Sequence, residues 1–242
     1  MTIFYLFEDG RFVYVCRIKL ININMKRIIL SAFVMGAVLT SCSDGGTKVE
    51  SKEAEVVEVQ ETATTQTYSV VAEGSHVDWK AAHLGGVQPR FGKIMIGKAE
   101  VLTNDNALTN AMIEMDMASF TVENFEDEES KMKLTGHLQS DDFFKIEAFP
   151  TSTFELTGVE AQTGEYNSKL TGNLTILGVA KSISFLANVS VADDAVAVKS
   201  ENFAIDRTEW GLTYNVEGTE GVPADYLIAN DINFTVDVKM TK

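Results

Sequence analysis

The segment Gly136-His137-Leu138-Gln139-Ser140-Asp141-Asp142-Phe143-Phe144 continues through Phe149-Pro150 into Thr151-Ser152-Thr153-Phe154-Glu155 and divides the chain between two sets of predicted strands. It is a helical, acidic and polar interruption in a sequence that otherwise alternates apolar and polar residues. We expect a helical crossover between two halves of a sheet, with Phe143, Phe144 and Phe149 plugging or lining one end. The flanking strands then decide what kind of sheet it is.

Alternation with a period of two residues marks the strands on both sides of the crossover. Such alternation directs one set of side chains into a core and the other into water. Before the crossover, the apolar positions are Val77, Trp79, Ala81, the run from Phe91 to Leu102, Ile113, Met115 and Met117. After it, they include Phe154, Leu156, Leu170, Leu174, Ile176, Ile183, Phe185, Phe203, Ile232, Phe234, Val236 and Val238. The pattern predicts about eight or nine strands, with Gly92 and Gly97 as sites of bends or bulges.

Short connections between these strands favour antiparallel hairpins, and no βαβ spacing is present. About eight one-sided strands can bury their apolar faces by closing into a barrel, which also removes exposed sheet edges. A two-sheet sandwich satisfies the same alternation and stays open as an alternative. A barrel of this size is either filled by its own side chains or holds one slender ligand.

The amino-terminal region has the three parts of a secretory signal. Met25-Lys26-Arg27 precedes an apolar run from Ile28 to Leu39, and Leu39-Thr40-Ser41-Cys42 resembles the lipobox of bacterial lipoproteins. The resemblance implies that Cys42 is the lipid attachment site and the first mature residue. We expect residues 1–42 to be the signal segment, with translation starting at Met25. The polar residues 43–67 are expected to form a flexible tether, and residues 68–242 the folded domain.

Charge and cysteine content exclude several functions. The chain has 20 basic and 35 acidic residues; five of the former and two of the latter lie in Met1–Ser41, so the remainder carries about −18. A field of this sign repels nucleic acid. Both cysteines, Cys16 and Cys42, precede the predicted domain, so a disulfide, a redox CxxC pair or a thiolate metal site is not expected inside it.

The polar residues give no pattern typical of an enzyme. His76, His83 and His137 have no recognised ligand spacing, so neither a metal site nor a catalytic site is expected. Asp141 and Asp142 are interpreted as charges near the positive end of a short helix capped by Ser140. Glu126-Asp127-Glu128-Glu129 is interpreted as a solvated helix start.

Three ordered segments resemble the YceI family of bacterial lipid- and polyisoprenoid-binding proteins. They are the crossover from Gly136 to Phe154, the hairpin Leu170-Thr171-Gly172-Asn173-Leu174-Thr175-Ile176-Leu177-Gly178-Val179-Ala180-Lys181, and Phe203-Ala204-Ile205-Asp206-Arg207-Thr208-Glu209-Trp210-Gly211. The Arg-Asp pair that many members carry before His-Leu is Thr135-Gly136 here. The resemblance implies an all-β fold: an antiparallel, lipocalin-like barrel of about eight strands with a short helical insertion in mid-chain and a long apolar cavity.

The resemblance also implies a site. Candidate cavity-lining residues are Trp79, Phe91, Ile113, Met115, Met117, Phe143, Phe144, Phe154, Leu174, Phe185, Phe203, Trp210 and Phe234. His83, His137 and Arg207 are candidates for polar residues at the mouth, although Arg207 and Trp210 also suit a structural corner. The expected ligand is an isoprenoid of quinone or polyprenyl type, or a fatty lipid, and no other cofactor is expected.

The leading functional hypothesis is a non-enzymatic, lipid-binding envelope lipoprotein that serves as carrier or reservoir. Its expected partners are a hydrophobic small molecule and the membrane that holds its lipid anchor, and it would face the periplasm or cell surface of a Gram-negative bacterium. One alternative is a structural or interaction lipoprotein whose barrel is filled by side chains. The other is a hydrolase acting on a lipid head group.

Overall fold

The computed structural model describes residues 7–8, 11–12, 45–57, 66–71 and 74–242, and the chain divides into two compact units, Met1–Cys42 and Ser43–Lys242. In the first unit, β1 (Phe7–Glu8) and β2 (Arg11–Phe12) form an antiparallel pair. Met25 and Cys42 lie outside the described residues. The signal and the lipid attachment therefore stay predictions.

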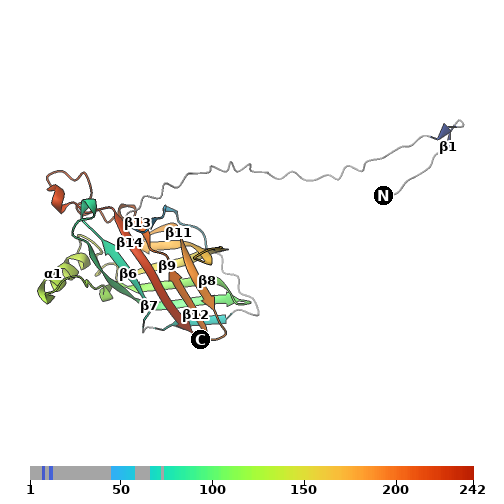
Figure 1. The fold of residues 1–242 in the computed structure, drawn as a ribbon, viewed down its shortest axis with the longest axis horizontal. Coiled ribbons are helices and arrows are strands. Elements are labelled where there is room, and N and C mark those ends of the chain that lie inside the picture. The colour runs from blue at the N-terminus through green and yellow to red at the C-terminus, as the bar shows by residue number, and fades with distance from the viewer. Residues whose placement is uncertain (1–6, 9–10, 13–44, 58–65, 72–73) are drawn as a thin grey trace. The chain divides into compact units, whose positions relative to one another are not determined.

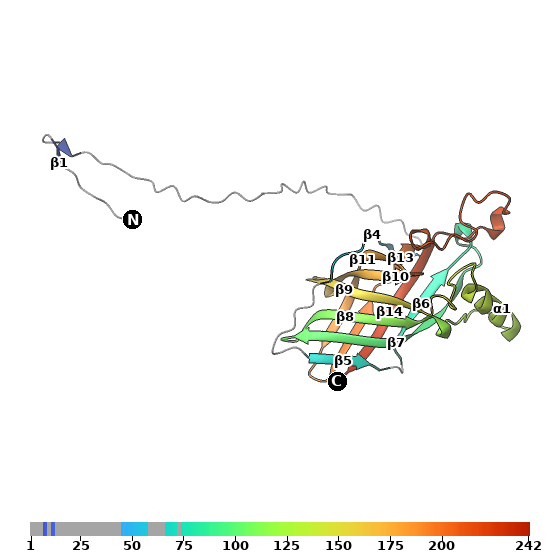
Figure 2. The same ribbon diagram turned by 180° about the vertical axis from the view of Figure 1, so that it is seen from behind.

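The second unit is built on a sheet of 12 strands, of which eight form a closed antiparallel ring (Figures 1 and 2). Each ring strand pairs with the next, and β14 pairs with both β12 and β6 to close it. In ring order they are β6 (His76–Ala81), β7 (Arg90–Asn104), β8 (Ala107–Asp116), β9 (Thr151–Ala161), β10 (Ser168–Ile176), β11 (Val179–Val191), β12 (Ala195–Ser200) and β14 (Asp231–Thr241). The predicted barrel is confirmed, and the sandwich alternative is wrong.

Two further strands extend the ring across interruptions between β5 (Gln66–Val70) and β6 and between β12 and β13 (Phe203–Asp206). β5 pairs with β7 and β14, and β13 pairs with β14 beyond the end of β12. A buried serine replaces backbone pairing at each interruption. Ser75 Oγ accepts from Lys239 N at 3.0 Å, and Ser200 Oγ accepts from Val236 N at 2.8 Å. Side-chain hydrogen bonds thus keep the wall continuous across both breaks.

Glycines mark two irregular points in the ring. The β7–β8 register shifts between Ile96 and Lys98, so the bulge predicted at Gly97 is present. The β9–β10 register shifts at Gly172, where an added β-carbon would collide with the ring of Phe154.

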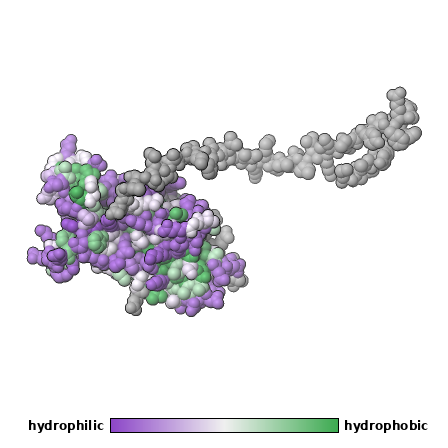
Figure 3. Space-filling model, viewed as in Figure 1, coloured by the Kyte–Doolittle hydropathy of each residue, from purple (hydrophilic) through white to green (hydrophobic). Residues whose placement is uncertain are grey.

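Figure 3 shows hydrophilic residues over most of the visible face, with an apolar area toward the C-terminus.

The mid-chain insertion begins with η2 (Met117–Ser119) and contains α1 (Glu128–Gln139). Asp127 caps α1 by accepting from Ser130 N at 2.7 Å, as expected for the acidic start. The role predicted for Ser140 is wrong, because this residue ends α1: its Oγ donates to His137 O at 2.7 Å. Asp141 therefore follows a helix end. The insertion also joins β8 to its ring neighbour β9, so it does not connect separate halves.

Three short 3-10 helices complete the fold: η1 (Leu84–Gly86), η3 (Arg207–Trp210) and η4 (Ala224–Tyr226). Figures 1 and 2 place α1, η1 and η4 at the same end of the barrel, which we call the helix end. Among the described residues, no helix has the length and apolar content needed to cross a bilayer.

Residues 45–57, which we call the strap, differ from the flexible tether expected for residues 43–67. β3 (Thr47–Lys48) pairs in parallel with β13, and β4 (Lys52–Glu53) pairs antiparallel with β11. The polar composition gave no sign of this, because the pairing uses backbone groups and requires no apolar periodicity. Residues 43–44 and 58–65 of the expected tether lie outside the described part of the chain.

Candidate functional site

The barrel encloses a narrow apolar cavity. The cavity has a volume of about 100 Å³. All lining side chains except that of Ser152 are apolar, and they come from every strand of the ring. Long, thin apolar molecules match such a space better than polar or bulky ones.

Most of the predicted lining residues lie on this wall. They are Ile113, Met115, Met117, Phe144, Phe154, Leu174, Phe185, Phe203 and Phe234. The wall also contains Val77, Leu156, Leu170, Ile176, Ile183, Val236 and Val238, which were predicted as apolar strand positions, and Ile94, Val101, Leu108, Ala111, Val198 and Met240. Strict alternation does not find all of them, because the register shifts in the β7–β8 pair bring Ile94 and Val101, and likewise Leu108 and Ala111, to the cavity although their positions differ in parity.

A second, smaller apolar space lies beside the first. Trp79 and Phe143 line only this outer space, whereas Phe144 and Phe234 line both spaces and separate them. Trp79, Phe120 and Phe144 form a chain of ring contacts, with centroid distances of 4.7 Å and 5.3 Å. Phe143 and Phe144 therefore lie at one end of the barrel interior, as predicted, whereas the half-buried Phe149 lines neither space and lies beside Gly178.

Two predicted lining residues do not line either space. Phe91 is 43% exposed, because the bulge at Gly97 reverses the parity of β7: Ile94 and Ile96 face inward before it, Ala99 and Val101 after it. Trp210 is fully buried within the wall, where its Nε1 donates to Leu174 O at 2.9 Å. Trp210 is thus part of the structural corner that the sequence analysis also considered.

Arg207 is buried among backbone carbonyls. Its Nε donates to Ala229 O at 3.0 Å, its Nη2 to Ile228 O at 3.1 Å, and its Nη1 to Leu212 O. Burial lowers the pKa of the guanidinium below its ordinary value, while the nearby Asp206 carboxylate opposes that shift. The side chain borders the outer space, but its nitrogens fix the loop between β13 and β14.

The other two candidate mouth residues, His83 and His137, contact different residues. His83 bridges to Ile228, and its Nδ1 lies 2.5 Å from Asp225 O. His137, on α1, lies 2.9 Å from Asp142 through Nε2 and meets the rings of Phe143 and Tyr214 edge-on. Arg207 and His83 thus share Ile228 as a backbone partner, whereas the contacts of His137 are with other residues.

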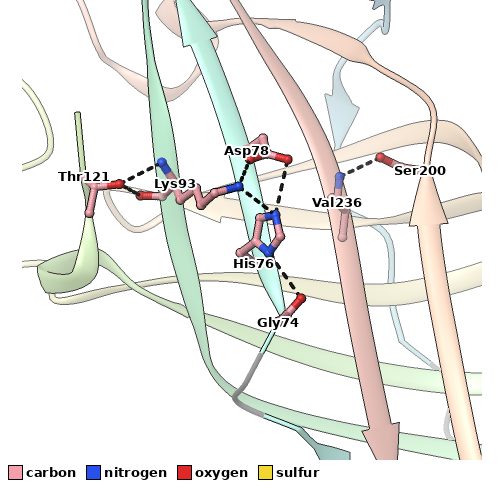
Figure 4. A network of polar contacts seen from close by, with 7 residues as sticks. All are labelled: Gly74, His76, Asp78, Lys93, Thr121, Ser200 and Val236. Carbon is pink, nitrogen blue, oxygen red and sulfur yellow. Dashed lines mark hydrogen bonds and ion pairs between the residues drawn. The ribbon is translucent and has the colours of Figure 1, made fainter. Parts of the chain in front are cut away.

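A polar cluster on β6 and β7 is shown in Figure 4. Lys93 Nζ lies 2.6 Å from Asp78 Oδ1 and 3.0 Å from His76 Nε2, and His76 Nδ1 lies 3.2 Å from Gly74 O. None of these residues lines the apolar cavity. Within the described ranges, no group of three or more His, Cys, Asp or Glu side chains is arranged to hold a metal ion.

Comparison with known proteins places this barrel in context. Residues 68–240 match the model of the YceI-like domain. A UPF0312 protein of Pseudomonas putida (strain W619) is 33% identical over 130 residues, which cover 52% of this chain and 62% of that protein. A UPF0312 protein of Azotobacter vinelandii is 28% identical over 127 residues, with the same coverage of 52% and 62%. The chain thus spans less than two thirds of the length of these curated relatives.

Two solved structures share the fold. Burkholderia cenocepacia BcnA has a TM-score of 0.52 at 19% identity, and the alignment covers 70% of this chain and 98% of that chain. A polyisoprenoid binding domain from Saccharophagus degradans, implicated in plant cell wall breakdown, has a TM-score of 0.50 at 13% identity, covering 72% and 97%. At these identities the likeness is one of fold.

Proposed function

We propose that this chain, which belongs to the YceI-like domain family, holds the apolar chain of an isoprenoid or fatty lipid inside its barrel as a carrier or reservoir. The observation that carries the proposal is the apolar cavity between the ring strands, with Ser152 its one lining residue that is not apolar. The Saccharophagus degradans domain of the same fold is described as polyisoprenoid binding, which supports the isoprenoid choice.

The cavity wall suits a hydrocarbon. A polar ligand group in this space would lose its hydrogen bonds to water without gaining protein partners, at a cost of roughly 1–3 kcal/mol. Methionine side chains such as Met115, Met117 and Met240 are flexible and adapt to irregular apolar shapes. We therefore expect any head group to stay outside the ring.

Energetics favour transport over permanent storage. Transfer of each methylene group out of water is favourable by about 0.8 kcal/mol of free energy. A lipid in a bilayer is already out of water, so its transfer from membrane to barrel is close to neutral. Small differences in affinity would then decide whether lipid is loaded or released.

The amino-terminal sequence supports a place at the envelope. Lipidation at Cys42 would keep the barrel next to a donor membrane, in the periplasm or at the cell surface of a Gram-negative bacterium. The loading step would then require no free diffusion of the lipid through water.

The side-chain-filled barrel remains a second candidate, favoured by the small cavity volume of about 100 Å³. Native mass spectrometry and lipid extraction of the purified protein distinguish the two. Lipid binding predicts a co-purifying apolar molecule, or uptake of a slender probe such as parinaric acid, a fluorescent polyene fatty acid. Repeated absence of both would leave the filled barrel as the account of this fold.

A further inference from the structure

The barrel wall has a seam between β11 and β13. The last five residues of β11 pair with β12, from Ala187 opposite Ser200 to Val191 opposite Val196. Before this contact, residues 179–186 of β11 pair with β10 on one side. β13, which follows β12 in the chain, pairs with β14 and β3. The two strand edges thus diverge, and the space between them is occupied by the strap.

The strap joins both edges of the seam. Thr47 N donates to Asn202 O and Val49 N to Ala204 O, each at 2.9 Å. On the β11 side, β4 places Glu53 opposite Lys181 and Lys52 opposite Ser182. Beyond β4, Asn173 holds the strap with two hydrogen bonds, from Glu55 N at 2.8 Å and to Glu55 O at 2.7 Å.

Glu201 links the seam to the strap. Its backbone N donates to Leu186 O at 2.8 Å, and its Oε1 accepts from Leu186 N at 2.7 Å. Its other carboxylate oxygen accepts from Thr47 Oγ1 at 2.9 Å. One buried carboxylate therefore connects β11, the β12–β13 break and the strap, and its hydrogen bond from Thr47 exists only while the strap is in place.

Only side chains separate the seam from the apolar cavity. The rings of Phe185 and Phe203 stack across it with a centroid distance of 4.5 Å and an interplanar angle of 5°. Both rings line the cavity. Phe185 and Ile183 also line a polar recess under the strap, so the recess and the cavity share a wall one side chain thick.

We propose that the seam is the site where the lipid chain enters and leaves the cavity, and that the strap is its removable cover. This inference rests on the proposed lipid-binding function. Opening here requires the release of two short strand pairings, of the hydrogen bonds that Asn173 and Glu201 make with the strap and of the exposed ion pair between Lys48 and Asp231, and the rotation of two phenylalanine rings. Opening at the helix end would break the carbonyl contacts of the buried Arg207 and the ring contacts of Trp79, Phe120 and Phe144. None of residues 45–57 is buried, and local opening is easiest where few buried contacts must be broken.

The test is to lock the strap. Glu53 and Lys181 are register partners on antiparallel strands, so a Glu53→Cys/Lys181→Cys pair is placed for a disulfide. Glu100→Cys/Met112→Cys, on register partners of β7 and β8, is the matched control away from the seam. The full chain with its native Cys16 and Cys42 is assayed under the same oxidising and reducing conditions. The readout is the initial rate of parinaric acid uptake from phosphatidylcholine vesicles.

The expected result is that oxidation of the strap pair slows uptake at least tenfold, that dithiothreitol restores the rate, and that affinity at equilibrium is unchanged. Asn173→Ala, which removes the two hydrogen bonds to Glu55, should speed uptake. Equal rates in the oxidised and reduced strap pair, or equal slowing in the control pair, would overturn the seam as the entry site. Failure of the unmodified chain to bind the probe at equilibrium would instead overturn the lipid-binding function itself.

Discussion

Trp210 in η3 donates its Nε1 hydrogen to the carbonyl oxygen of Leu174 in β10 at 2.9 Å, and the side chain of Leu174 lines the apolar cavity. This bond ties the loop after β13 to β10. It also explains why Trp210 supports the cavity without bordering it.

Trp210→Phe should lower the free energy of unfolding by about 1–3 kcal/mol, because the buried hydrogen bond to Leu174 O would be lost and the smaller ring would leave a cavity. Chemical denaturation followed by circular dichroism measures this change. Phe91→Leu, at a 43% exposed position on the outer face, is the control and should have a much smaller effect. Equal stability of the Trp210 variant and the wild type would show that the bond contributes nothing.

The stability of the first turn of α1 should depend on pH, because the carboxylate of Asp127 caps it. Its hydrogen bonds with Ser130 hold the pKa of this carboxyl below its ordinary value of 3.8. A lowered pKa means that the cap stabilises the helix above pH 3.8 and is lost as pH falls through the folded-state pKa. Hydrogen exchange at the amides of Ser130 and Lys131 should therefore be faster in Asp127→Ala than in Asp127→Asn at neutral pH. Identical protection in the two variants would contradict the cap.

The partition formed by Phe144 should limit ligand length. Phe144→Ala would join the cavity to the outer space, so geranylgeraniol should gain affinity over farnesol when each displaces parinaric acid. Phe143→Ala is the control, because Phe143 lines only the outer space. The Phe144 variant is also expected to lose about 3–5 kcal/mol of stability. A chain-length preference that does not change would mean that Phe144 is no barrier.

Cys42 should carry the lipid anchor. Expression in a Gram-negative host with radiolabelled palmitate should label the wild-type chain and leave Cys42→Ser unlabelled. The labelled protein should fractionate with membranes. Label retained by the serine variant would place the attachment elsewhere.

The strands were predictable because each buries one face. The alternation of Ile232, Phe234, Val236 and Val238 along β14 defines a strand with an inner face from sequence alone, and the glycine bulge at Gly97 was predicted in place. The effect of the bulge on which β7 side chains face inward was not predicted. One extra residue turned Phe91 outward, since a shift of one position reverses every side chain beyond it.

Contacts that rest on backbone groups left no sequence signal. The strap reads as a polar tether, yet β3 and β4 pair with the edges of β13 and β11. Serine is a residue type that often caps the start of a helix, but here Asp127 caps the start of α1 and Ser140 lies at its C-terminal end. The seam closed by Phe185 and Phe203 depends on where two strands diverge, which only the folded chain reveals.

The central claim is that the cavity holds an apolar chain, and a pair of adjacent residues tests it most directly. Ala111 lines the cavity, whereas Met112 on the same strand is 38% exposed. Equilibrium binding of parinaric acid should be lost in Ala111→Phe, whose ring would fill the channel, and kept in Met112→Phe, with circular dichroism showing both variants folded. Wild-type affinity in a folded Ala111→Phe protein would contradict binding inside the barrel.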